Sequence, residues 1–268
     1  MLNSNDVKIV IPTHSNYIDI CNIFMQLFRK NWPDCPYSIY GAVIGDDYKI
    51  PWCQSMYFGS AQTLTDAVYF INKKYPTEFT ICFLGDAFIT GKVNQADVEK
   101  LIKDIYRDRI NYCRLVTRAY EKKHLKNRQY RLITGKDVYC FSFVAFIASH
   151  NFIESEFKDS SDLEFEKKYL EKCLYLEQNY TYDDSAMLIK NVFRISPGIN
   201  KGKWDRHVYA LLNKKYRDIN FEKRQLLPWK MQIRTDIINV IQRIFPAKYR
   251  HLFKKLLSNI GFDFNTIY

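Results

Sequence analysis

Apolar residues follow two alternating patterns over the first 120 residues. Residues 8–11, 38–44 and 78–84 are short apolar runs, rich in β-branched and aromatic side chains, which predict buried strands. Apolar residues recur at three- and four-residue spacing over 20–28, 64–71 and 98–105, which predicts helices with one apolar face. This alternation predicts an α/β fold with a mostly parallel sheet covered by helices on both faces.

The rest of the chain is less regular. Residues 111–117 and 138–148 predict further strands, separated by a polar, basic segment at 121–136. From Ser160 onward the pattern is helical, with 204–212 and 236–245 as amphipathic pieces. We therefore expect one domain over residues 1–225 and a helical extension over 226–268.

Polar residues follow three of the expected strands at the point where each strand ends. They are Thr13 and His14, then Asp46 and Asp47, then Asp86. Ligands of open α/β sheets bind outside the carboxyl ends of the strands, so we expect these residues to share a site. A carboxylate there can bind a divalent cation that also holds a diphosphate. The alternative is that Asp86 only caps a turn or the following helix.

Positive charge is concentrated near the C-terminus. Between Lys223 and Lys255 there are nine Lys or Arg residues and one acid, Asp236, so this window carries +8 of the total +11. The basic residues interleave with apolar stripes, a composition typical of a helix lying on an anionic membrane surface. A helix packed on the domain with a solvated basic face is the other interpretation.

The cysteine pattern and the lack of long apolar segments indicate the cellular compartment of the protein. The seven cysteines form no CxxC pair, which favours a reducing compartment without zinc or disulfides. The first residues lack the basic and apolar regions of a signal peptide, and no apolar stretch approaches the ~20 residues of a spanning helix. We expect a cytoplasmic protein, peripheral on the inner face of the cell membrane.

Seven motifs occur in a recognisable order. They are KIVIPTH (8–14), the strand into Asp46-Asp47, FLGDAF (83–88), YCRL (112–115), VYCFSFVA (138–145), LEFE (163–166) and INKGKW (199–204). Together they resemble GT-A (Rossmann-like) glycosyltransferases of bacterial surface-polysaccharide biosynthesis. The resemblance covers roughly residues 7–225.

The resemblance implies roles for particular residues. Pro12, Thr13 and His14 would belong to the part that grips the nucleotide, with His14 shaping the loop. Asp46 and Asp47 are candidates for contacting the base or ribose, and a solvated turn is the alternative for them. Gly85 and Asp86 would lie at the diphosphate, with Asp86 holding Mn²⁺ or Mg²⁺. Because Ala87 stands where the family commonly has a second acid, Lys201 and Lys203 are candidates for neutralising phosphate charge instead.

The resemblance also suggests a general base, the carboxylate that would accept the proton of the attacking hydroxyl. Phe165-Glu166 matches the late Phe-Glu pair of the family, so Glu166 ranks first. Asp184, in Tyr182-Asp183-Asp184, ranks second, and Glu164 is the third candidate. Ordinary solvated charge is the alternative for each of them.

The function implied is transfer of a sugar from a nucleotide sugar, expected to be a UDP-sugar, to a glycan or lipid-linked glycan. A nucleic-acid-binding protein is an alternative suggested by the charge and the aromatic residues, but no known nucleic-acid motif is present, so no nucleic-acid partner is expected. A nucleotidyltransferase acting on sugar phosphates is another, although residues 12–16 lack the glycine-rich, basic phosphate loop that it would need. A glycosyltransferase that has lost activity is the last.

Overall fold

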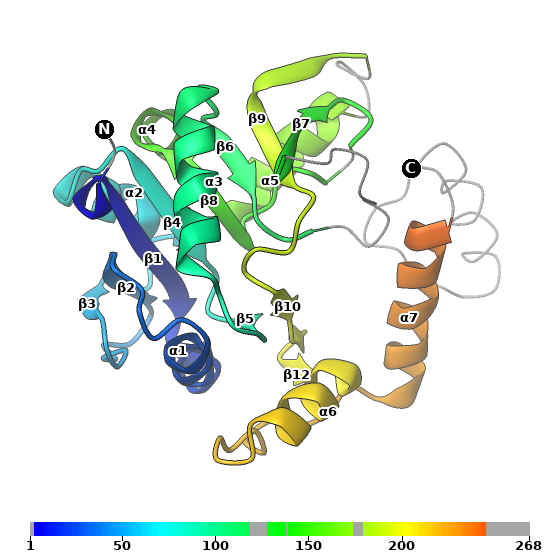
Figure 1. The fold of residues 1–268 in the computed structure, drawn as a ribbon. Helices are drawn as coiled ribbons and strands as arrows, with labels where there is room; N and C mark the ends of the chain where they lie inside the picture. Colours follow the sequence, from blue (N-terminus) through cyan, green and yellow to red (C-terminus); the bar gives the residue numbers. More distant parts are fainter. Residues whose placement is uncertain (1–2, 118–127, 138, 174–178, 245–268) are drawn as a thin grey trace.

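An eight-stranded sheet forms the centre of the computed structural model, which describes residues 3–117, 128–137, 139–173 and 179–244 (Figure 1). Its strands are β1 (Val7–His14), β2 (Ser38–Ile44), β3 (Gln54–Tyr57), β4 (Phe79–Phe83), β6 (Tyr112–Arg114), β7 (Tyr130–Thr134), β8 (Ala145–Ser149) and β9 (Thr181–Leu188). The strand order is β3-β2-β1-β4-β8-β6-β9-β7. Pairs β2–β3, β1–β2, β1–β4 and β6–β9 are parallel, and β8 and β7 run antiparallel to their neighbours.

Helices cover both faces of this sheet. On one face lie α1 (Ile18–Asn31) and α3 (Gln95–Arg107), and on the other lie α2 (Leu64–Lys74), α4 (His150–Glu156) and α5 (Asp162–Glu171). Alternate residues of β1 point to opposite faces of the sheet. Ile9 and Ile11 pack in the core under α1 and α3, and Val10 packs in the core on the other face. The predicted fold class is therefore confirmed: an α/β protein with a largely parallel, mixed sheet flanked by helices.

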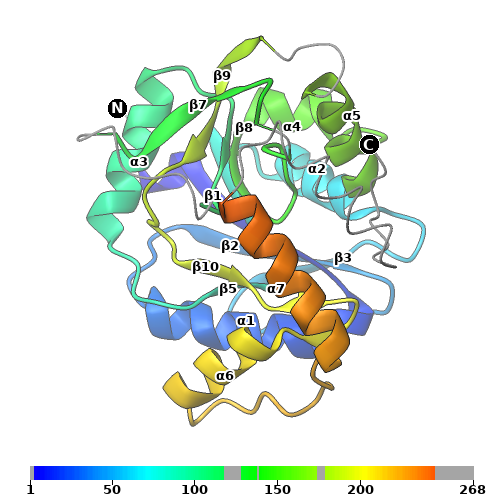
Figure 2. The ribbon, with the colours of Figure 1, turned by 90° about the vertical axis from the view of Figure 1, so that its right-hand side faces the viewer.

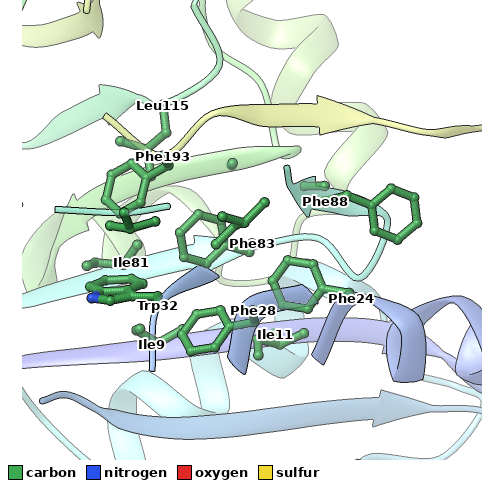
Figure 3. Packing of buried hydrophobic residues seen from close by; sticks show 14 of the residues in the cluster. Ile9, Ile11, Phe24, Phe28, Trp32, Ile81, Phe83, Phe88, Leu115 and Phe193 are labelled. Carbon is green, nitrogen blue, oxygen red and sulfur yellow. The ribbon is translucent and has the colours of Figure 1, made fainter. Parts of the chain in front are cut away.

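Aromatic side chains fill the core under α1. Phe24, Phe28 and Trp32 recur every four residues, and all three are fully buried against the sheet (Figure 3). Phe83, the last residue of β4, lies 6.0 Å from Phe24 and 5.4 Å from Phe193 between ring centroids. The end of β4, from which the Asp86 turn follows, is therefore held by a rigid aromatic cluster.

Smaller elements extend the carboxyl edge of the sheet. The strands β5 (Ala87–Ile89) and β10 (Ile195–Pro197) form one antiparallel pair, and β11 (Ile199–Asn200) and β12 (Lys203–Trp204) form another. The helices α6 (Arg206–Lys215) and α7 (Trp229–Ile244) follow, and 3-10 turns occur at Ser4–Asp6 (η1) and Ser15–Tyr17 (η2). Figures 1 and 2 agree that α7 stands beyond β5 and β10, on the side to which the carboxyl ends of β1 and β4 point.

Several strands differ from the expectation, among them β9 and β7 of the central sheet. β9 lies in a region where the sequence predicts helices, and β7 lies inside the segment expected to separate two strands. Four of the five buried residues of β9, Ser185–Leu188, have no strong β-propensity, so pairing with β6 and β7 decides their conformation. In β7 only Tyr130 and Ile133 are buried, which is too short a pattern to detect among charged neighbours.

The expected extension at 226–268 is described only as far as residue 244, and Lys248, Arg250, Lys254 and Lys255 lie outside the described residues. Its beginning is attached to the domain: Leu227 is fully buried, and its N–H donates to the carbonyl oxygen of Trp204 at 2.8 Å. Gln232 is also fully buried and donates to a carboxylate oxygen of Asp205 at 2.8 Å. Within the described part of the chain no helix is both long and apolar enough to cross a membrane.

Candidate functional site

Asp86 lies in the turn between β4 and β5. β4 is buried along its whole length, so the strand delivers the carboxylate to a fixed position. Burial raises the pKa of Asp86 to about 6, and a hydrogen bond from its own backbone acts against this rise. No other described residue donates to the carboxylate or forms an ion pair with it. A desolvated carboxylate without a partner, at a strand end, marks a candidate site.

The end of β1, which leads into the first loop (residues 15–17), packs directly against this turn. The N–H of Gly85 donates to the carbonyl oxygen of Pro12 at 3.3 Å. A Cβ atom at Gly85 would lie 3.1 Å from the hydroxyl oxygen of Thr13, a buried residue, so a side chain at position 85 would press on the end of β1. The structure thus brings Pro12, Thr13, Gly85 and Asp86 together, as the sequence predicts.

The loop that follows β2, residues 45–47, contacts the first loop. Gly45 has a φ of +96°, and a Cβ there would lie 2.4 Å from the hydroxyl oxygen of Ser15 and 3.0 Å from the His14 ring. Asp46 accepts a long hydrogen bond from Ser15 at 3.5 Å, and Asp47 is exposed. His14 itself accepts a hydrogen bond from the N–H of Asn16 through Nδ1 at 3.1 Å, which shapes the loop.

The hairpin β11–β12 brings the two candidate lysines to the same region. Lys201 and Gly202, the turn residues, both have positive φ values of 49° and 76°, as a type I′ hairpin requires. The N–H of Gly198, just before the hairpin, donates to the carbonyl oxygen of Asp86 at 3.3 Å. Lys201 is exposed and Lys203 is partly buried. The base of the hairpin therefore lies beside the backbone of Asp86, and Lys201 and Lys203 follow within five residues of that contact.

Arg224 locks the hairpin and the first loop together. Its guanidinium donates to both carboxylate oxygens of Asp19 at 2.7 Å, to the carbonyl oxygen of Asn16, and to that of Gly202 at 3.3 Å. The guanidinium also lies 4.5 Å from the ring centroid of Tyr17. Although burial opposes ionisation of Asp19, the Arg224 hydrogen bonds hold the pKa of that carboxyl below its usual value. The sequence carries no local signal for this clamp.

Glu166 lies at the same edge of the sheet, on α5. One of its carboxylate oxygens accepts from the Ser142 hydroxyl at 3.0 Å and from the N–H of Phe143 at 2.8 Å. The next residue, Val144, accepts from the N–H of Leu84 at 2.9 Å, two residues before Asp86. Oε2 of Glu166 has no hydrogen-bond partner among the described residues. Glu166 is thus linked to the Asp86 turn through one loop and keeps an oxygen available.

The structure does not bring Asp184 to Asp86. Asp184 accepts a hydrogen bond from the Asn111 side chain at 3.1 Å. The carbonyl oxygen of Asn111 accepts from the N–H of Ser149. Ser149 in turn pairs with Phe79, at the start of β4. Asp86 follows the far end of that strand, which at about 3.3 Å per residue is about 13 Å or more away. Asp184 therefore lies at the opposite edge of the sheet, because β9 passes that edge before reaching its buried half.

Glu164 is used as a helix cap. It accepts from the N–H and the hydroxyl of Ser161, both at 2.8 Å, which forms a capping box at the start of α5. These hydrogen bonds lower the pKa of Glu164, an exposed residue. The Ser-x-x-Glu spacing was visible in the sequence and indicates a cap rather than a base.

No protein-family model matches the chain, and no curated protein matches it in sequence. Among solved structures, it is similar to TarS of Staphylococcus aureus at 10% identity and a TM-score of 0.45, over 89% of this chain and 42% of that one. It is also similar to a putative nucleotide-diphospho-sugar transferase from Desulfovibrio desulfuricans G20 at 8% identity and a TM-score of 0.39, over 89% of this chain and 98% of that one.

A cytidylyltransferase from Leptospira borgpetersenii is a third similar structure, at 13% identity and a TM-score of 0.41, over 98% of this chain and 99% of that one. At identities and TM-scores this low, these likenesses carry no argument about activity. Any inference about activity therefore rests on the geometry around Asp86.

Proposed function

We propose that this protein is a glycosyltransferase that moves a sugar from a nucleotide sugar, a UDP-sugar, to a glycan or lipid-linked glycan acceptor of surface polysaccharide synthesis. The observation that carries the proposal is the Asp86 carboxylate, which has no partner among the described residues and lies where the first loop and the lysine hairpin meet. In this proposal the Asp86 carboxylate and the two lysines of the hairpin serve a diphosphate and its sugar.

In the proposed reaction the bond between the sugar's anomeric carbon and the diphosphate oxygen breaks, and the acceptor oxygen bonds to that carbon. UDP leaves with the electron pair of the broken bond, and the acceptor hydroxyl gives its proton to a base. Lys201 and Lys203 would bind the phosphate oxygens as negative charge accumulates there. Glu166, through its available oxygen, is the proposed base.

A divalent cation, Mn²⁺ or Mg²⁺, is part of the proposal and would supply further charge neutralisation on the diphosphate. Asp86 would be its protein ligand. Among the described residues no three His, Cys, Asp or Glu side chains are grouped as a metal site, and Ala87 is fully buried in the core. A single carboxylate fits such an ion when phosphate oxygens and water complete the coordination, as is usual for Mg²⁺.

A ligand panel tests the function. We expect one UDP-sugar to raise the melting temperature, because a ligand that binds only the native state stabilises it, and Mn²⁺ to increase the shift. The same mixture with an acceptor glycan should release UDP. If a nucleoside triphosphate is instead the stabilising ligand and pyrophosphate is released on adding a sugar 1-phosphate, the protein is a nucleotidyltransferase.

The C-terminal helix supports a further part of the proposal, peripheral attachment to the cytoplasmic face of an anionic membrane. Trp229, Ile233 and Val240 lie within one narrow stripe of α7 and are 63%, 53% and 51% exposed. Lys230 lies beside this stripe and is exposed. An exposed apolar stripe with flanking cations is the composition of an interfacial helix.

Replacing Ile233 and Val240 by Gln should weaken this attachment without disturbing the domain, because both side chains are exposed. In sedimentation with vesicles containing phosphatidylglycerol, the wild type should pellet at low salt and be released as salt screens its basic residues. The double variant should remain in the supernatant. Leu163→Gln, an equally simple change at a residue 72% exposed on α5, should pellet like the wild type. Equal pelleting of all three proteins would rule out α7 as the attachment surface.

A further inference from the structure

A groove of about 770 Å³ runs between the edge strand β3 and the helix α2, outside the site described above. β3 contributes Met56 and Tyr57, followed by Phe58 and Gly59, and α2 contributes Phe70, Lys73 and Lys74. The volume lies in the range of ligand-binding sites.

The helix presents one outward face to this groove. Phe70, Lys73 and Lys74 are three and four residues apart, so they lie on one side of α2, whereas Val68 and Ile71 on another side are fully buried in the core. The chain therefore places an aromatic ring and two ammonium groups together on a fixed element. A rigid element is what a binding site needs.

Aromatic rings with exposed faces line the groove. Tyr57 is 50% exposed and Phe70 is 41% exposed. Phe58 lies nearly parallel to Phe70, with 6.1 Å between the ring centroids and 15° between the planes, so the Phe70 ring is supported from one side. Keeping two large rings in water costs free energy that a ligand with C–H faces would recover.

Within the part of the chain that the structure describes, the two lysines have no carboxylate partner. Other helical lysines form ion pairs, such as Lys168 with Glu156 at 2.7 Å. Among the described residues no acid pairs with Lys73 or Lys74, and the Lys74 ammonium lies 5.4 Å from the Tyr75 ring. The groove therefore combines aromatic faces with uncompensated positive charge, which is complementary to an anionic ligand.

One end of the groove, at Gly59, lies at the edge of the sheet that carries Asp86. The lysine end lies toward the other edge, because Tyr75, next to Lys74, stacks on Tyr40 near the start of β2. The carbonyl oxygen of Gly59 accepts from the N–H of Gly45 at 3.2 Å, and Gly45 packs on the first loop. β3 is three strands from β4, which at about 4.8 Å per strand places the groove about 14 Å from the Asp86 strand. That separation suits a part of the acceptor remote from the transferred sugar.

We propose that this groove binds an acidic stretch of the acceptor glycan, with Phe70 and Tyr57 stacking on sugar rings and Lys73 and Lys74 pairing with carboxylate or phosphate groups. The proposal extends the proposed glycosyl transfer by assigning an anionic acceptor class. A peptide added to the free edge of β3 fits less well, because Gln54 and Ser55 do not line the groove.

Binding measured without any donor tests the assignment. The full-length protein is applied to an array of carboxylated, phosphorylated and neutral oligosaccharides, with an acidic poly-glutamate peptide alongside. We expect at least one acidic glycan class to bind and its neutral counterpart not to bind. Replacing both Lys73 and Lys74 by Ala should weaken this binding about tenfold, and Phe70→Ala should weaken it to a similar degree.

Lys214→Ala with Lys215→Ala is the matched control, because these are also consecutive exposed lysines at a helix end, with the second lysine against a tyrosine ring. The control should bind like the wild type. The proposal is overturned if no acidic glycan binds, or if the Lys73/Lys74 variant binds as well as the wild type. If the acidic peptide binds and the variant loses that binding, the groove belongs to a protein partner instead.

Binding by the Asp86→Asn variant separates this inference from the proposed activity. That variant should retain the acidic glycan, since Asp86 lies outside the groove. If groove binding holds while no nucleotide sugar is ever used, the proposed reaction fails and the glycan site stands.

Discussion

Asp86→Asn is expected to lower turnover by about 10²-fold or more and, at the same time, to raise the melting temperature at neutral pH. The loss of activity follows from removing a charge that holds the diphosphate and its cation in the transition state. The gain in stability follows from burial, because the fold disfavours the ionised carboxyl and raises its pKa to about 6.

The sign of the stability change depends on pH. The unfolded carboxyl has a pKa of about 3.9, so between about pH 4 and pH 6 the unfolded chain releases its proton while the native protein retains it. Stability therefore falls across this window and stays lower above it, by about 3 kcal/mol at most. Asn removes this cost, so the variant should gain stability at pH 7.5 and little at pH 4.

Steady-state rates and thermal melts at both pH values measure these effects. Asp34→Asn is the control, since Asp34 is exposed and far from the site in sequence. Turnover within about threefold of the wild type, which corresponds to less than 1 kcal/mol, would place the site elsewhere.

Glu166→Gln should lower turnover by roughly 10²–10⁴-fold with little change in donor affinity, as expected for the loss of a general base. The amide is a discriminating replacement here. Its oxygen can still accept from Ser142 and Phe143, so the loop beside Asp86 keeps its hydrogen bonds. The available oxygen is replaced by a nitrogen that cannot take up the proton.

Single-turnover rates, together with donor affinity from thermal shifts, test this role. Ser142→Ala removes one hydrogen bond to Glu166 and leaves the carboxylate, so it should reduce the rate far less. If Ser142→Ala is as damaging as Glu166→Gln, Glu166 acts only by holding the loop. If both are mild, transfer proceeds without this base.

The sequence predicts those parts of the site that lie at the ends of clearly patterned strands. The position of Asp86 follows from a buried strand and a turn, and the Pro12, Thr13 and Gly85 contacts follow from parallel strands whose carboxyl ends share an edge. The position of Asp184 could not be predicted in this way. It depends on where β9 enters the sheet, which long-range pairing with β6 and β7 decides.

The role of Glu166 also depends on contacts that the sequence alone does not reveal. Helical spacing places Glu164 and Glu166 on α5, but only the fold shows that Glu166 meets Ser142 and that Glu164 turns back to cap its own helix. The groove beside α2 was missed because Lys73 and Lys74 look like ordinary solvated charge until β3 is placed next to them.

The Arg224 clamp has a consequence for how the protein is made. The first loop is synthesised early, yet the guanidinium that fixes Asn16 and Asp19 comes from a residue 205 positions after Asp19. A nascent chain can build β1 and α1 long before this contact becomes possible, since domains form as their residues leave the ribosome. The loop therefore takes its final shape only once Arg224 has emerged, and chains truncated before that residue would carry an unfinished site.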